Sequence, residues 1–134
     1  MPHHPTPTFE HRITISPGDI DQMGHVNNAV YLQWVQETIV SYWKHVAPIE
    51  ARGGLLWVAL KHDITYRAPL FLDDNVEALV TATETRGSRA SFKTIFKRGK
   101  DVSAEVISSW CCVDAATRKP KRVARDLVRR FLPD

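Results

Sequence analysis

The sequence is poor in the features that mark several specialised classes of protein. Its only two cysteines, Cys111 and Cys112, are adjacent, which is a poor geometry for a disulfide and not the spacing of a metal site. We interpret them as reduced strand or core residues. No apolar run approaches the roughly 18 to 20 residues that a membrane span needs. Residues 1–10 also lack the basic and apolar pattern of a secretory signal. We therefore expect a cytoplasmic protein with no membrane partner.

A strong excess of one charge is also missing. The sequence has 18 Lys and Arg residues and 15 Asp and Glu residues, which gives a formal charge of +3. Because the bases form no long block, we expect no nucleic-acid partner. The mild basicity, with a pI near 9.0, suits a small ligand that bears phosphate. With 134 residues, 43% apolar and 25% charged, the composition is that of one globular domain with a real core.

Hydrophobic periodicity predicts an α+β domain. The first strand is expected at residues 9–16, after a flexible, proline-rich tail over residues 1–8. Four further strands and a short final helix are expected at 56–66, 75–84, 89–98, 102–113 and 125–132. This order predicts a single domain over residues 9–134, in which an antiparallel sheet covers one long helix.

The long helix is expected from about residue 28 to residue 46. Asn27 or Asn28 suits its N-cap, and Pro48 stops it. Its apolar residues recur at helical spacing and are expected to face the core. They are Tyr31, Trp34, Val35, Thr38, Ile39, Tyr42, Trp43 and Val46.

The most informative segment lies between the first strand and the long helix. Residues 19–31 read Asp-Ile-Asp-Gln-Met-Gly-His-Val-Asn-Asn-Ala-Val-Tyr. A helix start offers unpaired N–H groups and partial positive charge, so it binds anions or polarises a carbonyl. A carboxylate beside it, such as Asp21, supplies a base or a nucleophile, and Gly24 lets the backbone approach a ligand. Residue chemistry alone leaves a second interpretation open, in which the aspartates form turns, His25 is a structural ring and the asparagines are caps.

The pattern Asp-x-Asp-x-x-Gly-His-Val-Asn-Asn-x-x-Tyr before a long helix resembles the hotdog-fold acyl-CoA thioesterases of the 4-hydroxybenzoyl-CoA thioesterase-like family. A weaker match follows at Tyr66-Arg-Ala-Pro69, and the resemblance covers about residues 9–132. It implies a hotdog fold, with an antiparallel sheet wrapped around one long central helix. It also implies a homodimer or homotetramer with active sites between subunits.

The resemblance further implies hydrolysis of an acyl-CoA to a free carboxylic acid and CoA, without a metal or another cofactor. Asp21 matches the catalytic aspartate, a nucleophile or general base, and Asn28 matches the main N–H donor to the oxyanion. His25 is expected either to orient substrate or water or to be structural. The other expected substrate contacts are Gly24, Val26, Asn27 and Tyr31 in the motif, and Arg86, Ser88 and Arg89 at a hairpin, where relatives bind the nucleotide.

Two alternatives stay open. In the first, the basic surface binds an acyl-carrier protein, whose thioester is then the substrate. In the second, the chain is a non-catalytic hotdog module that binds acyl-CoA. Glu37, on the helix, is expected to be solvated or hydrogen-bonded rather than catalytic. Weaker candidates for contacts with CoA phosphates are Lys121, Arg122 and Arg125.

Overall fold

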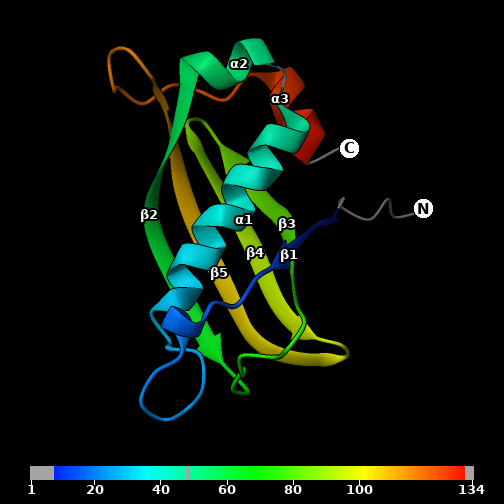
Figure 1. The fold of residues 1–134 in the computed structure, drawn as a ribbon. Helices are drawn as coiled ribbons and strands as arrows, with labels where there is room; N and C mark the ends of the chain where they lie inside the picture. Colours follow the sequence, from blue (N-terminus) through cyan, green and yellow to red (C-terminus); the bar gives the residue numbers. More distant parts are fainter. Residues whose placement is uncertain (1–7, 48, 132–134) are drawn as a thin grey trace, which may run out of the picture.

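A five-stranded antiparallel sheet and one long helix make up most of the molecule (Figure 1). The computed structural model describes residues 8–47 and 49–131. The strands lie in the order β1-β3-β4-β5-β2, so that β1 and β2 form the edges. Their bounds are β1 Thr8–Ile13, β2 Leu55–Tyr66, β3 Val76–Arg86, β4 Arg89–Arg98 and β5 Asp101–Asp114. The predicted α+β class is therefore confirmed.

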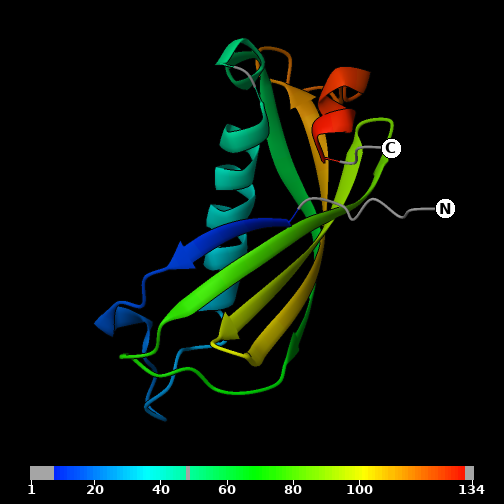
Figure 2. The ribbon, with the colours of Figure 1, turned by 90° about the vertical axis from the view of Figure 1, so that its right-hand side faces the viewer.

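The long helix, α1 (Val30–Val46), lies against one face of the sheet (Figure 2). The other helical segments are a 3-10 turn at Pro17–Asp19, α2 (Ile49–Gly54) and α3 (Arg125–Phe131). Within the described residues, no helix is long and apolar enough to cross a membrane.

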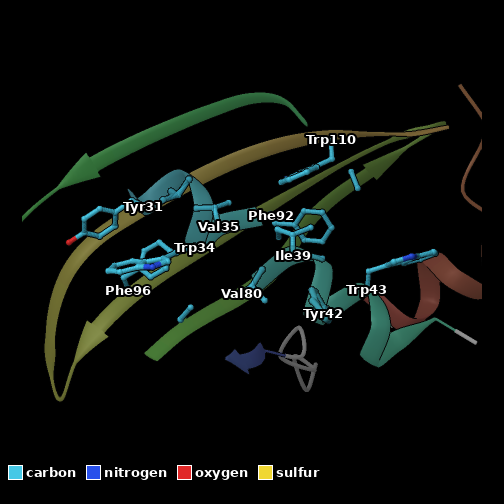
Figure 3. Close-up of a cluster of buried hydrophobic side chains, with 14 of the residues drawn as sticks. Tyr31, Trp34, Val35, Ile39, Tyr42, Trp43, Val80, Phe92, Phe96 and Trp110 are labelled. Carbon is cyan, nitrogen blue, oxygen red and sulfur yellow. The ribbon is translucent and has the colours of Figure 1, made fainter. Parts of the chain in front are cut away.

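Aromatic side chains fill the space between α1 and the sheet (Figure 3). Trp34 and Trp43 on α1 are 3% and 7% exposed, which confirms their predicted place in the core. Tyr31 and Tyr42 meet Phe96 and Phe92 edge to face, with ring centroids 5.4 and 6.0 Å apart. Each buried aromatic side chain stabilises the fold by roughly 1.5–3 kcal/mol. The single stripe on α1 thus fixes the side of the sheet that the helix covers.

The first strand is shorter than expected at its end. β1 stops at Ile13, whereas the sequence predicts a strand to residue 16. Pro17 has no N–H for a sheet ladder and opens the 3-10 turn, and the Ser16 N–H donates to Asp19 Oδ2 at 2.9 Å. Of the expected tail, Thr8 belongs to β1, and residues 1–7 lie outside the described residues.

The start of α1 also differs from the sequence prediction. Ala29 occupies the N-cap position, so the assignment of Asn27 or Asn28 to it is wrong. The Asn27 side chain instead accepts the Ala29 N–H at 3.0 Å, which closes a turn before the helix. The expected stop at Pro48 lies outside the described residues. α2 was not predicted, because a six-residue segment ending in two glycines has little helix propensity.

The two ends of α1 define two ends of the molecule (Figure 1). At its N-terminal end lie the loop before α1 and the end of β2, and we call this the loop end, residues 19–31 and 66–69. At its C-terminal end lie α2, the β3–β4 turn and α3, and we call this the turn end, residues 49–54, 85–89 and 121–131. With 17 residues, α1 separates the two ends by about 25 Å.

Candidate active site

The loop before α1 is a small hairpin with a tight turn. Ile20 and Val26 form an isolated antiparallel bridge. Inside it, the Asp21 N–H donates to the His25 carbonyl at 2.9 Å, and the Gly24 N–H donates to the Asp21 carbonyl at 3.0 Å. Gly24 has a φ of +83°, a left-handed conformation that other residues rarely adopt. The glycine is therefore required by the turn itself, which places Asp21 and His25 side by side.

The Asp21 carboxylate has two neighbours. Its Oδ1 accepts the Met23 N–H at 2.9 Å, and its Oδ2 lies 3.7 Å from His25 Nδ1. About a quarter of each side chain is exposed, at 26% for Asp21 and 27% for His25. One carboxylate oxygen therefore holds the turn, while the other faces the imidazole.

The backbone N–H groups at the start of the helix differ in whether they have a hydrogen-bond acceptor. The Asn27 side chain accepts the Ala29 N–H. The Asn28 carbonyl accepts the Tyr31 N–H at 3.3 Å and the Tyr66 hydroxyl at 3.0 Å. Among hydrogen bonds between described residues, none uses the Asn28 N–H. That N–H is therefore a donor available to a ligand.

A cavity of about 210 Å³ opens at this point. The loop, the first turn of α1 and the segment after β2 form its wall, which consists of His25, Val26, Asn28, Tyr31, Tyr66, Arg67, Ala68 and Pro69. Asp21 is not part of the wall, but its carboxylate neighbours His25, which is. At the rim, Arg67 Nη2 is paired with Glu105 Oε2 at 3.1 Å.

Two neighbouring tyrosines line this cavity, and one of them, Tyr66, donates its hydroxyl to the Asn28 carbonyl. Their rings meet edge to face, 5.3 Å apart. Burial raises the pKa of Tyr31; the Ser103 hydrogen bond lowers it to a smaller extent, and Tyr66 adds a small further rise. Burial also raises the pKa of Tyr66 above its usual range. Both hydroxyls stay protonated near neutral pH, so the Tyr66 hydroxyl remains a hydrogen-bond donor to Asn28.

The structure brings four of the predicted site residues together around one cavity: His25, Val26, Asn28 and Tyr31. Asp21, Gly24 and Asn27 lie in the loop that supports them. Sequence reasoning assigned no site role to Tyr66, which holds the Asn28 carbonyl. The Tyr-x-x-Pro match was the available signal for it, because Pro69 lines the same cavity.

The predicted hairpin contacts lie at the turn end. Arg86 and Arg89 are exposed and stand opposite each other in the β3–β4 register. Ser88 is half-buried, and its carbonyl accepts the Cys112 N–H at 2.7 Å. The structure therefore separates these three residues from the loop by the length of α1.

A second, basic cavity of about 370 Å³ lies beside that hairpin. It is lined by Thr85, Gly87, Arg122, Val123, Arg125, Val128 and Arg129. Side chains alternate faces along a strand, so Thr85 faces this cavity while Arg86 points to the opposite face of the sheet. The sequence alone assigns no site role to Arg129, because only the folded position of α3 brings it near the β3–β4 turn.

Comparison with known proteins gives a consistent result. A family model described as thioesterase-like superfamily matches residues 15–131. A thioesterase from Thermus thermophilus, complexed with coenzyme A and Zn, has a TM-score of 0.79 and 20% identity, covering 91% of this chain and 90% of that one. Slr0204 from Synechocystis, a 1,4-dihydroxy-2-naphthoyl-CoA thioesterase, has a TM-score of 0.78 and 17% identity, covering 93% and 96%.

A third structure, the hypothetical protein SAV2348 from Staphylococcus aureus in complex with CoA, has a TM-score of 0.82 and 14% identity, covering 97% of this chain and 85% of that one. No protein with a curated description matches the chain by sequence. The expected hotdog fold is confirmed by these matches.

Proposed function

The chain belongs to the thioesterase-like superfamily and is a thioester hydrolase, and we propose that it hydrolyses an acyl-CoA to a free carboxylic acid and CoA. The observation that carries this proposal is the available Asn28 N–H beside a cavity that His25 lines, with Asp21 next to His25. CoA is bound in two of the similar structures, which supports CoA as the carrier of the acyl group. The cytoplasmic location expected from the sequence is part of the proposal, and two free cysteines support it.

The thioester carbonyl would lie against the Asn28 N–H. As water attacks the carbonyl carbon, negative charge develops on the oxygen, and a fixed N–H donor stabilises it by roughly 3–4 kcal/mol. The tetrahedral intermediate then expels the CoA thiolate by breaking the C–S bond. The Tyr66 hydroxyl orients the Asn28 peptide through its carbonyl.

Asp21 is the proposed general base. Its Oδ1 accepts the Met23 N–H, and the side chain lies beside His25 rather than in the cavity wall. This position supports removal of a proton from water more than direct attack on the carbonyl. His25, which touches both the cavity and the carboxylate, would orient that water.

The proposal includes a homodimer, or a homotetramer built from it. β2 is an edge strand that exposes Leu56, Val58 and Leu60 at 38%, 47% and 47%. Such an edge favours pairing with another strand. Antiparallel pairing of two β2 strands about their middles would put the Leu55 end of one beside the Tyr66 end of the other. Each loop end would then face the partner's turn end.

The basic residues of the turn end are the proposed contacts for the CoA phosphates. Three guanidinium groups, of Arg122, Arg125 and Arg129, surround one cavity without an acidic side chain in its wall. Arg86 and Arg89 add positive charge on the other face of the hairpin. Guanidinium groups bind phosphate through paired hydrogen bonds, which suits the pyrophosphate and the 3′-phosphate of CoA.

The test is thiol release from a panel of short aliphatic, long aliphatic and aromatic acyl-CoAs. We expect Asp21→Asn to lower kcat at least about hundredfold, because a positioned base contributes on that scale. Asp73→Asn, an exposed carboxylate outside the cavity wall, is the matched control and should keep the wild-type rate. Near wild-type turnover by a folded Asp21→Asn protein would contradict the assignment.

The same assay separates the carrier-protein alternative, which the basic turn end also favours. Faster release from an acyl-carrier protein than from the CoA ester of the same acyl group would make the carrier the substrate. A stable complex with unhydrolysed acyl-CoA, with no thiol release from either carrier, would indicate a binding module.

A further inference from the structure

One segment joins the loop before α1 to the sheet. Among hydrogen bonds between described residues, two connect residues 19–29 to a part of the chain that is distant in sequence. In the first, the Val26 N–H donates to the Leu70 carbonyl at 2.8 Å. In the second, the Tyr66 hydroxyl donates to the Asn28 carbonyl at 3.0 Å. Both lead to residues 66–71, which we call the clamp segment.

The clamp segment is itself attached to two inner strands of the sheet, β4 and β5 (Figure 2). At its start, the N–H groups of Arg67 and Ala68 donate to the Ser103 carbonyl on β5, at 2.8 and 3.1 Å. At its end, it is attached to the last residue of β4, Arg98, through the side chain of Asp74. Inner strands are paired on both sides, so both attachments are to a well-supported part of the sheet.

The attachment at Asp74 depends on one carboxylate oxygen. Asp74 Oδ2 accepts the Phe71 N–H at 2.8 Å and a hydrogen bond from Arg98 Nη1 at 3.0 Å. The Asp74 N–H returns a bond to the Phe71 carbonyl at 3.0 Å, which closes a turn. Leu70, the acceptor for the Val26 N–H, directly precedes that turn. A short chain of bonds therefore leads from Arg98 to the backbone of the loop before α1.

Arg98 lies near two carboxylates that differ in exposure. The side chains of Arg98 and Asp74 are 35% and 20% exposed. The second acid, Asp101, is 3.9 Å from Arg98 Nη2 and is 75% exposed. Solvent screens exposed ion pairs, whereas a short, partly buried and hydrogen-bonded pair is stronger. The pair with Asp74 is therefore the one that can hold the backbone in place.

We propose that Arg98 and Asp74 are positioning residues for the hydrolysis, acting through the clamp segment on Val26 and so on the loop before α1. Neither residue lines the cavity. Bonds within the loop fix Asp21 and His25 relative to each other, whereas the clamp segment fixes the loop relative to the cavity wall. A displacement of about 1 Å can slow a reaction up to about hundredfold. The effect on rate rests on the proposed function, and the effect on the position of Val26 does not.

The first measurement is thiol release from the acyl-CoA that the wild type hydrolyses fastest. We expect Arg98→Gln to lower kcat about tenfold and to change KM less than about twofold, because misplaced groups impair the chemical step. Asp74→Asn should lower kcat similarly, and Arg98→Lys should regain part of the rate because it keeps the charge. Asp101→Asn, which removes the other acid beside Arg98, is the matched control and should keep the wild-type kcat and KM.

A double variant tests whether the two residues act as a pair. If their ion pair carries the effect, Arg98→Gln combined with Asp74→Asn should have a kcat close to that of either single variant. Reductions that multiply would mean independent roles and would overturn the proposal. The same holds for wild-type turnover by Arg98→Gln, or for a loss in Asp101→Asn as large as that in Asp74→Asn.

The position of the loop is read from the hydrogen exchange of single amides by NMR. We expect the Val26 amide to exchange about tenfold faster in Arg98→Gln, because its bond to Leu70 opens more often. The Val123 amide, which donates to the Gly87 carbonyl at the turn end, is the internal reference and should keep its rate. Equal increases at both amides would indicate a global loss of stability. That result, or an unchanged Val26 amide, would overturn the proposal.

The proposed function can fail separately. If the wild type releases no thiol from any acyl-CoA, the hydrolysis is rejected, and the exchange of the Val26 amide still decides whether Arg98 and Asp74 hold the loop. If the wild type hydrolyses acyl-CoA and Arg98→Gln does so at the same rate, the proposed function stands and the positioning role is rejected.

Discussion

The loop end and the turn end assemble their functional residues in different ways. At the loop end, Asp21, His25 and Asn28 come from one short segment, and hydrogen bonds within that segment set their positions. At the turn end, the basic cavity combines the β3–β4 turn with α3, which are far apart in sequence. A single backbone hydrogen bond, from the Val123 N–H to the Gly87 carbonyl at 3.0 Å, joins the two segments beside it.

The difference suggests a division of labour. Hydrogen bonds within the loop hold Asp21, His25 and Asn28 in defined positions. A reacting carbonyl requires such exact placement of the groups around it. Long, flexible arginine side chains surround the basic cavity, and they can follow a phosphate without exact placement. Substitutions at the loop end should therefore lower kcat, whereas substitutions at the turn end should raise KM.

The largest effect in this comparison is expected from Gly24→Ala. A left-handed conformation costs an alanine roughly 1–2 kcal/mol, so the turn would shift Asp21 and His25, and kcat should fall about tenfold or more. Gly18→Ala, in the 3-10 turn just before the loop, is the control, because a Cβ at either glycine meets no atom within 4 Å and, of the two, only Gly24 has a positive φ. Equal kcat values for the two variants would contradict the proposal that the backbone of the loop positions the catalytic groups.

A smaller effect is expected from the double variant Arg122→Gln and Arg129→Gln. Loss of two phosphate contacts should raise KM for acyl-CoA about tenfold and leave kcat nearly unchanged. KM for the corresponding acyl-pantetheine, which lacks the nucleotide, should not change. A larger rise of KM in Arg86→Gln with Arg89→Gln would instead place the nucleotide on the outer face of the hairpin.

Much of the fold could be predicted because periodicity is a local signal. The stripe of α1 and the alternation in β3, from Val76 to Ala82, each repeat within a few residues. Hydrophobic patterns do not report α2, whose helix depends on contacts outside its six residues. Nor do they fix the N-cap of α1, since Asn27 lies two residues before the N-cap and its side chain accepts the N–H of the N-cap residue, Ala29.

The candidate site follows the same rule. Residues 19–31 contain the whole loop motif, so its chemistry could be predicted from the sequence. Tyr66 and Pro69 reach the cavity only because β2 ends beside α1. No sequence pattern links Arg52 in α2 with Arg118 in a distant turn, yet the fold brings them to the wall of one cavity.

The smallest expected effect is on the pH dependence of stability, at a residue in the strand that connects the two ends. His62 lies on β2 against the Trp110 ring, and burial lowers the pKa of His62 below its ordinary value of 6.5. The neutral ring is favoured in the folded state, so its contribution to stability is complete above about pH 6.5 and is lost as the pH falls towards the folded-state pKa. The urea midpoint of the wild type should thus fall more between about pH 7.5 and about pH 5 than that of His62→Phe, which keeps a ring without a titrating group. Equal falls would mean that the His62 ring is hydrated in the folded protein.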